Sequence, residues 1–230
     1  RSNKNNLHFI STPFHNSAVD FLDQIGVSSL KIASFEFNDH ELIEYASRKG
    51  RPMILSTGMA SRKEIDINYK LLNKKLKNNF AFLKCSSSYP AKINDLNLNT
   101  IDKLKEDYNC PIGYSDHSVG DFAAIAAISK GACIIEKHVC LDKKTGIDSD
   151  FSQTPDQFIN FVKNCKQTWL SLGKIKFGPT QSERKSYKNR RSLFAIQKIN
   201  KNDKFTINNV ASVRPANGLK PIYLKKIIGK

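Results

Sequence analysis

Short apolar runs alternate with longer amphipathic stretches over the first three quarters of the chain. Continuous apolar content over a few residues is typical of parallel strands that are covered on both faces. The stretches between the runs have the residue spacing of amphipathic helices. Such regular alternation predicts an α/β fold, either an open doubly wound sheet or a closed barrel. The six runs lie at residues 7–11, 29–34, 52–56, 80–85, 111–115 and 132–138.

Capping residues mark several expected helix ends. The pairs Asn38–Glu41 and Ser61–Glu64 have the spacing of a capping box. Thr154–Pro155 is expected to supply the N-cap and the first residue of another helix. The apolar stripe of that helix, which we expect to pack in the core, is Phe158, Phe161, Val162, Cys165 and Trp169. The glycines expected to end helices are Gly26, Gly50 and Gly131.

Polar residues gather where nearly every apolar run ends. In a closed barrel the carboxyl ends of all strands meet at one mouth, whereas an open sheet collects only those near its switch point. The distribution therefore favours a (β/α)8 TIM-type barrel over residues 1–173. Six of its eight strands are visible, and we expect the first two to precede residue 1. The strand-end residues are Ser11–Thr12, Ser34, Glu36, Ser56–Thr57, 86–89, 115–117 and 136–138.

The pattern changes after Gly173. Residues 174–191 are basic, polar and aperiodic, which favours an interdomain linker. Residues 192–230 combine short apolar runs with turn residues, which is typical of a small separate domain. We therefore expect two domains joined by this linker.

Bulk composition narrows the class of protein. The chain has 230 residues, of which 40% are hydrophobic, and it contains no apolar run long enough to cross a membrane. The N-terminal stretch lacks a signal-peptide core, so we expect a cytoplasmic protein with no membrane partner. The five cysteines are widely spaced without a C-x-x-C pair, so we expect reduced thiols rather than a metal knuckle.

Positive charge keeps a second class of function open. The formal net charge is +16, and Lys and Arg clustered on one face would favour nucleic-acid binding. The lysines are spread over surface-like positions, so we expect no nucleic-acid partner and a positive field that attracts an anionic substrate. The alternative is a basic binding module, or an inactive fragment whose open sheet edges pair with another chain.

Motifs at the strand ends resemble one known family, the sialic acid synthases. They occur in the family's order, one per successive strand, and the match extends along essentially the whole chain. The motifs are STPF (11–14), KIASFE (31–36), STGM (56–59), CSSSYP (85–90), SDHS (115–118) and EKH (136–138), then RRSLF (190–194), KFT (204–206) and RPANGL (214–219). The resemblance implies a TIM-type barrel, a C-terminal antifreeze-like (SAF) domain over residues 192–230, and a domain-swapped homodimer.

Members of this family condense phosphoenolpyruvate with an acylated amino sugar. Phe35 and the DSDFS segment (148–152) are more similar to the pseudaminic acid branch than to the neuraminic branch. The resemblance therefore implies a transferase that joins phosphoenolpyruvate to 2,4-diacetamido-2,4,6-trideoxy-altrose, giving pseudaminic acid and phosphate. N-acetylneuraminate and legionaminate synthases are the alternatives within the family.

The resemblance also implies where the metal and phosphoenolpyruvate bind. His117 and His138 are implied as ligands of Mn²⁺ or Mg²⁺, and an ion held by imidazoles can polarise an aldehyde oxygen. Lys31 is implied as a catalytic cation at phosphoenolpyruvate, because an ammonium and hydroxyls satisfy phosphate and carboxylate oxygens. The hydroxyl residues implied at the same substrate are Thr12, Ser34, Ser56, Ser87 and Ser115.

Four further residues are implied on the sugar side. Glu36 would handle protons during the addition, and Tyr89 and Asp148 would contact the sugar. Arg214 in the RPANGL motif is implied to reach the partner subunit's barrel and bind the N-acyl group, for which a guanidinium offers a rigid fork of donors. The residues implied as catalytic are Glu36, Lys31 and His138.

Overall fold

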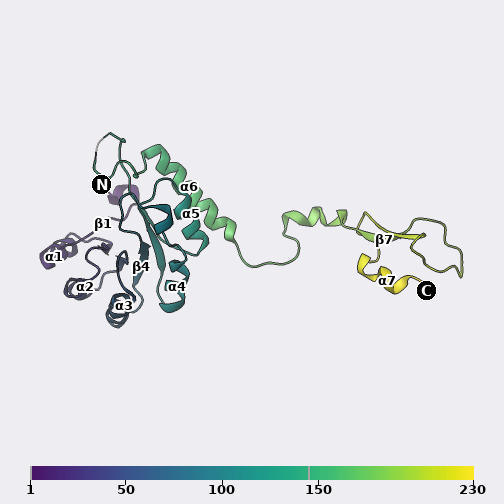
Figure 1. The fold of residues 1–230 in the computed structure, drawn as a ribbon, viewed down its shortest axis with the longest axis horizontal. Coiled ribbons are helices and arrows are strands. Elements are labelled where there is room, and N and C mark those ends of the chain that lie inside the picture. The colour runs from purple at the N-terminus through teal and green to yellow at the C-terminus, as the bar shows by residue number, and fades with distance from the viewer. Residues whose placement is uncertain (1, 145) are drawn as a thin grey trace. The chain divides into compact units, whose positions relative to one another are not determined.

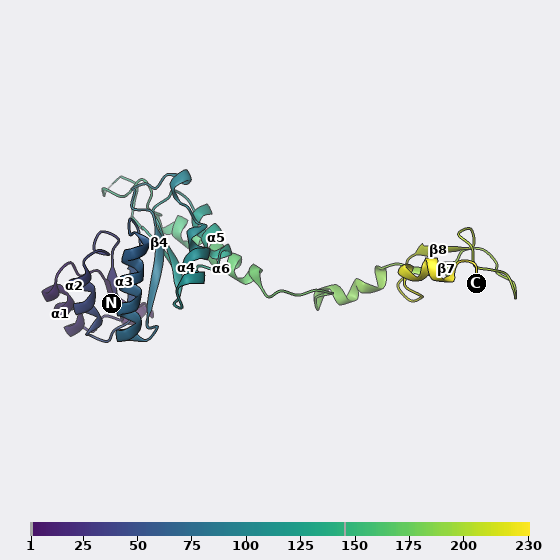
Figure 2. The ribbon, with the colours of Figure 1, turned by 60° about the horizontal axis from the view of Figure 1, so that its bottom comes forward.

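The computed structural model describes residues 2–144 and 146–230, which divide into two compact units, residues 1–173 and 174–230. Six parallel strands form one sheet in the first unit, in the order β1-β2-β3-β4-β5-β6. A helix follows each strand and lies on the outer side of the sheet (Figures 1 and 2). The predicted α/β alternation is therefore confirmed.

The six strands lie close to the predicted apolar runs: β1 (Ile10–Ser11), β2 (Ser29–Ile32), β3 (Met53–Ser56), β4 (Phe80–Cys85), β5 (Ile112–Asp116) and β6 (Ile135–Lys137). The helices are α1 (Asn16–Gln24), α2 (His40–Ser47), α3 (Arg62–Leu76), α4 (Thr100–Asp107), α5 (Phe122–Ser129) and α6 (Pro155–Leu172). Two short 3-10 helices accompany them, η1 (Ser2–Asn5) and η2 (Ile93–Asp95).

The core of the first unit lies between the sheet and its helices. Strand β4 is buried along its whole length, and Phe82 packs edge-on against Phe37 and Tyr108, with ring centroids 5.9 and 5.8 Å away. Leu72 of α3 and Ile101 of α4 are fully buried in the same cluster. Burial of large apolar side chains is the dominant stabilising contribution in folding. This packing therefore fixes the strand ends that carry the polar residues.

The sheet is strongly curled. Lys31 on β2 and Glu136 on β6 are separated by three intervening strands, yet Lys31 Nζ and Glu136 Oε2 are 3.6 Å apart. In a flat sheet these strands would be about 19 Å apart, at ~4.8 Å per strand. Two side chains cannot span that distance. The first unit is therefore a six-stranded half-barrel of the TIM type, with the carboxyl ends of its strands along one rim.

Two of the three predicted helix starts are confirmed. Ser61 and Glu64 form a capping box at the start of α3, and α6 begins at Pro155, directly after its N-cap Thr154. The predicted glycines follow α1, α2 and α5 with positive φ angles, which a residue without a Cβ adopts without strain.

The predicted capping box at Asn38–Glu41 is wrong. Helix α2 begins at His40, and Asp39 is its N-cap, whose Oδ1 accepts a hydrogen bond from the Leu42 N–H at 3.0 Å. Asn and Asp cap helices about equally well. Asn38 and Asp39 were therefore equally good N-cap candidates, and the sequence could not decide between two helix starts one residue apart.

The apolar stripe of α6 is only partly in the core, contrary to prediction. Phe161 is buried, but Val162 and Trp169 are 48% and 62% exposed. Helix α6 packs against α5, and this contact covers one side of the stripe.

Helix α6 is also the longest of the described helices, at 18 residues. None of the helices in the described residues is long and apolar enough to cross a membrane.

The second unit is small and strongly basic. Strands β7 (Ser192–Ala195) and β8 (Val210–Val213) form an antiparallel pair. Of the chain's 37 Lys and Arg residues, 15 lie in residues 174–230, and the acidic residues there are Glu183 and Asp203. Basic residues are therefore denser in this unit than in the first, which holds the other 22 in its 173 residues. Its other elements are η3 (Ser182–Lys185), η4 (Tyr187–Asn189), η5 (Pro221–Tyr223) and α7 (Leu224–Ile227), of which η3 and η4 lie in the predicted linker.

The environments of two cysteines predict different thiol reactivities. All five cysteines are free thiols, with Cys133 exposed and Cys110 partly buried. Burial raises the pKa of Cys110 to about 11, so at pH 8 only about 0.1% of it is the reactive thiolate. We expect iodoacetamide to modify Cys133 at least tenfold faster than Cys110 at pH 8, measured by peptide mass spectrometry. Between pH 8 and 9.5 the Cys110 rate is expected to rise about 30-fold, because its thiolate fraction grows tenfold per pH unit below the pKa. Equal rates at pH 8 would contradict this prediction.

Candidate active site

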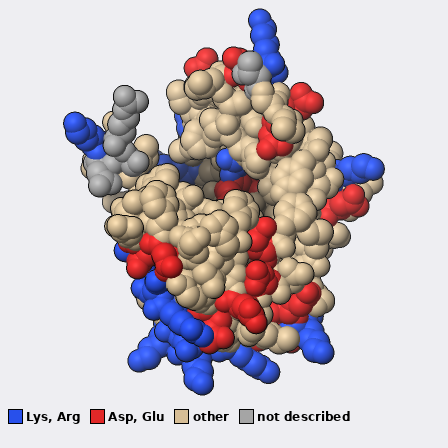
Figure 3. Space-filling view, turned by 90° about the vertical axis from the view of Figure 1, so that its left-hand side faces the viewer, with Lys and Arg blue, Asp and Glu red and all other residues tan. Residues whose placement is uncertain are grey.

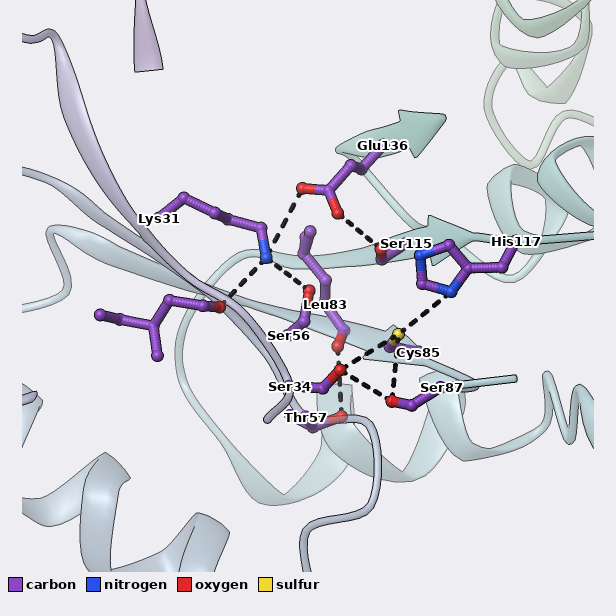
Figure 4. Close-up of polar contacts among 11 residues, drawn as sticks. Lys31, Ser34, Ser56, Thr57, Leu83, Cys85, Ser87, Ser115, His117 and Glu136 are labelled. Carbon is purple, nitrogen blue, oxygen red and sulfur yellow. Dashed lines mark hydrogen bonds and ion pairs between the residues drawn. The ribbon is translucent and has the colours of Figure 1, made fainter. Parts of the chain in front are cut away.

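A buried ammonium lies on the inner face of the half-barrel. Lys31 Nζ donates to Ser56 Oγ at 2.7 Å and to the backbone oxygen of Ile32 at 3.0 Å (Figure 4). Burial lowers the pKa of Lys31, and the nearby carboxylate of Glu136 opposes this effect. A desolvated ammonium is stabilised by any further negative charge. Lys31 is therefore well placed to bind an anion at the rim.

Hydroxyl groups from several strand ends surround this ammonium. Ser56 ends β3 and accepts from Lys31, and Ser115 on β5 donates to Glu136 Oε1 at 2.6 Å. The hydroxyls of Ser34 and Ser87 are 2.7 Å apart. The curl of the sheet thus brings together four serines that are far apart in the sequence. The fifth predicted hydroxyl residue, Thr12, directly follows β1 and is half-buried.

Glu136 connects Lys31 to Ser115 in this network. It was not predicted as a functional residue. Its two carboxylate oxygens face Lys31 on β2 and Ser115 on β5, so it links strands from both sides of the half-barrel (Figure 4). The signal was present in the sequence, because Glu136 and His138 lie two residues apart on one strand end. Residues at this spacing point to the same face of a strand.

Two imidazoles lie side by side on the same rim. His117 directly follows β5 and His138 directly follows β6, and their ring centroids are 5.1 Å apart. The Nδ1 of His117 donates to the backbone oxygen of Ser86 at 2.9 Å. The Nδ1 of His138 faces Asp148 Oδ2 at 3.5 Å. Each imidazole is thus oriented through Nδ1, as metal-binding histidines commonly are.

The protonation of His138 favours metal binding. Burial lowers the pKa of His138, and the neighbouring His117 lowers it further. A neutral imidazole is the form that coordinates a metal. Among the described residues no cluster of three or more His, Cys, Asp or Glu side chains is arranged to hold an ion. The described part of the rim thus offers two adjacent imidazoles, without a third side chain of these types beside them.

Glu36 carries an unpaired oxygen. This residue follows β2 and is half-buried, and its Oε2 is fully buried without a hydrogen-bond partner among the described residues. A buried carboxylate oxygen without a partner is costly and is seldom retained in native proteins. Glu36 therefore holds an unsatisfied acceptor among the described residues.

Aromatic side chains border the imidazoles. The Tyr89 ring lies 4.3 Å from that of His117, and Phe151 lies 4.9 Å from His138. Tyr89 is 42% exposed and was predicted, whereas Phe151 is buried and was not assigned a role. Phe151 lies within the DSDFS segment, so the loop that supplies Asp148 also covers the imidazole pair.

Arg214 belongs to the second unit. It directly follows β8 and is exposed, so its predicted role is not part of the network described above. The first unit alone brings together the other predicted residues on one rim.

Figure 3 shows a hollow on the left-hand face of Figure 1, with both basic and acidic side chains at its floor.

Known proteins share this architecture and sequence. Pseudaminic acid synthase from Campylobacter jejuni is 39% identical over 224 residues, which cover 96% of this chain and 64% of that protein. N,N'-diacetyllegionaminic acid synthase from the same species is 34% identical over 99% of this chain and 69% of its own length. The crystal structure of N-acetylneuraminic acid synthetase from Leptospira borgpetersenii matches with a TM-score of 0.76 at 40% identity, over 80% of this chain and 65% of that one.

The similarity identifies the family of the chain. The chain spans slightly less than two thirds of the C. jejuni pseudaminic acid synthase that it matches. Residues 1–177 match the NeuB family, and this range includes every residue of the rim described above. Together with the identities to named synthases, this match shows that the chain belongs to the NeuB family.

Proposed function

We propose that the complete protein is a pseudaminic acid synthase that condenses phosphoenolpyruvate with 2,4-diacetamido-2,4,6-trideoxy-altrose. The observation that carries this proposal is the convergence of a buried ammonium, a set of hydroxyls and two imidazoles on one rim. The identity to C. jejuni pseudaminic acid synthase supports the choice of sugar.

Phosphoenolpyruvate would bind at Lys31 and the surrounding hydroxyls. The ammonium would compensate the charge of the phosphate or carboxylate, and the hydroxyls of Ser34, Ser56, Ser87 and Ser115 would donate to its oxygens. Glu136 would hold Lys31 and Ser115 in place through its two oxygens. Thr12 would contribute from the end of β1.

The reaction requires alignment of two substrates and one water. The C3 carbon of phosphoenolpyruvate forms a bond to the aldehyde carbon of the open-chain sugar, whose oxygen gains a proton. Water then adds to C2 and loses its proton, and the carbon–oxygen bond to phosphate breaks to leave the 2-oxo acid and inorganic phosphate. No covalent bond to the protein is needed, so the enzyme contributes mainly through positioning and charge stabilisation.

Glu36 would manage protons in this sequence. Its free Oε2 could accept from the attacking water or from a sugar hydroxyl. Tyr89 and Asp148 flank the imidazoles and would contact the sugar.

His117 and His138 would hold Mn²⁺ or Mg²⁺. When bound, the ion supplies Lewis acidity that makes the aldehyde carbon more electrophilic. The Nδ1 contacts of the two residues would orient their imidazoles toward it.

Several features of the complete protein are part of the same proposal. The curl that brings Lys31 to Glu136 supports closure of the sheet into a (β/α)8 barrel in the complete protein. The RPANGL motif supports an antifreeze-like second domain and a domain-swapped homodimer, in which Arg214 would bind the N-acyl group. We propose that the protein acts in the cytoplasm.

The choice of sugar can be tested directly. The complete protein is incubated with Mn²⁺, phosphoenolpyruvate and each candidate sugar, and phosphate release is measured. We expect kcat/KM for 2,4-diacetamido-2,4,6-trideoxy-altrose to exceed that for N-acetylmannosamine by about 10²-fold or more, because a site built for two acylamino groups loses paired hydrogen bonds with a sugar that has one. Equal rates would contradict the pseudaminic assignment without affecting the family.

A further inference from the structure

A buried ion pair lies immediately behind the two imidazoles. Asp116 and Lys137 are the last residues of β5 and β6, and they are register partners across these strands. Asp116 Oδ2 and Lys137 Nζ are 2.8 Å apart, and their side chains are 0% and 1% exposed. His117 and His138 are the next residues along the two strands. The pair therefore joins β5 to β6 one residue before each imidazole.

The ion pair faces away from the substrate side of the sheet. Side chains alternate between the two faces of a strand, and Ser115 and Glu136 on the inner face are bonded to each other at 2.6 Å. Lys137 Nζ instead lies 6.0 Å from the centre of the Phe161 ring on α6, on the helix side. Neither charge is therefore free to bind a molecule at the rim.

The same pair fixes the short segment that carries His117. Asp116 Oδ1 accepts hydrogen bonds from the Ser118 N–H at 2.9 Å and from the Ser118 hydroxyl at 2.7 Å. Lys137 Nζ also donates to the Ser118 backbone oxygen. His117 therefore lies between two residues that are both tied to Lys137, and Lys137 is itself the residue before His138.

We propose that Asp116 and Lys137 are positioning residues for the imidazole pair. They fix the register of β5 against β6 and the backbone around His117, so that the two imidazoles face one divalent ion together. Stability alone does not require such a pair, because replacing both charges of a buried ion pair by apolar groups is often neutral or stabilising. This inference rests on the proposed metal site.

The test measures metal affinity rather than turnover. Mn²⁺ is titrated into the complete protein and the free ion is followed by electron paramagnetic resonance, for the wild type and for Lys137→Met. We expect the Kd for Mn²⁺ to rise about 10–100-fold, the usual loss when a group that orients a metal ligand is removed. The control is Lys130→Met, which removes a partly exposed ion pair of 2.7 Å between Lys130 and Asp102, far from the rim. Its Kd is expected to stay within about twofold of wild type.

Each outcome decides the role of the pair. If Lys137→Met does not fold, the double variant Asp116→Asn/Lys137→Met removes both charges and keeps an acceptor for Ser118. Unchanged Mn²⁺ affinity in either folded variant overturns the proposal, even if Tm falls, because only a structural contribution then remains. Failure of both variants to fold also overturns the proposal, because the ion pair is then needed for folding itself. If His138→Ala leaves Mn²⁺ binding unchanged, the metal site itself is wrong, which is a separate result.

Discussion

Replacing Lys31 by methionine is expected to lower kcat/KM for phosphoenolpyruvate by about 10²–10³-fold while leaving the fold intact. Methionine has a similar length, so the position on β2 remains filled. The variant loses the ammonium, and hydrogen bonds to charged groups contribute about 1.5–3 kcal/mol each. Steady-state phosphate release at varied phosphoenolpyruvate concentration measures the effect, and circular dichroism and Tm report the fold.

Lys84→Met is the matched control for Lys31→Met. Lys84 is also buried on a strand of the same sheet, donates to the Cys85 backbone oxygen at 2.6 Å, and has a pKa lowered by burial. Lys84 and Cys85 are neighbours on β4, so their side chains point to opposite faces of the sheet. The Cys85 thiol faces Ser87 and His117, so Lys84 points away from the rim. We expect its kcat/KM to change by less than about threefold. A comparable loss in both variants would contradict a specific role for Lys31.

The second large effect is expected for His138→Ala. In the proposed metal site, this variant removes one of the two adjacent imidazoles. Lewis-acid stabilisation by a bound metal is worth several kcal/mol, so kcat is expected to fall by about 10³-fold, on the order of 4 kcal/mol. Phosphate release and the Mn²⁺ content after gel filtration are measured on the same sample.

His8→Ala is the control for His138→Ala, because it removes a histidine that lies outside the proposed metal site. His8 is exposed, and its Nδ1 contacts Ser28 Oγ at 3.1 Å near the opposite ends of the strands. We expect this variant to retain both turnover and metal within about twofold. Full Mn²⁺-dependent activity in His138→Ala would remove His138 from the proposed metal site.

The strands could be predicted because each is a short apolar run between polar turns. The length of β1 could not be predicted, since only Ile10–Ser11 pairs with β2 out of the predicted run 7–11. Strand β1 is at the edge of the sheet, where one side has no neighbouring strand to extend the pairing. Helix α2 shows the same limit, because two adjacent residues were equally good caps.

Site residues could be predicted where one strand and its own sequence motif are enough to place them, as for Lys31 and the two histidines. The position of Glu136 on the same strand face as His138 could be read from their spacing, but its partners could not, and Phe151 was missed because its role depends on a contact with His138. The link from Glu136 to Lys31 exists only because the sheet curls, and no local pattern encodes the degree of curl. The pairing of Asp116 with Lys137 likewise depends on the register of two strands. Alternation predicts the face of a residue, but not its partner.

The exposed side of α6 carries an intrinsic fluorescent probe of this chain. The sequence contains one tryptophan, and that residue is Trp169, near the end of α6 and 62% exposed. Its emission is therefore expected near the long-wavelength limit of a hydrated indole and open to quenching by acrylamide. Anything that covers this helix will shift the emission to shorter wavelength and reduce quenching. A single intrinsic signal can thus follow docking at α6 without any label.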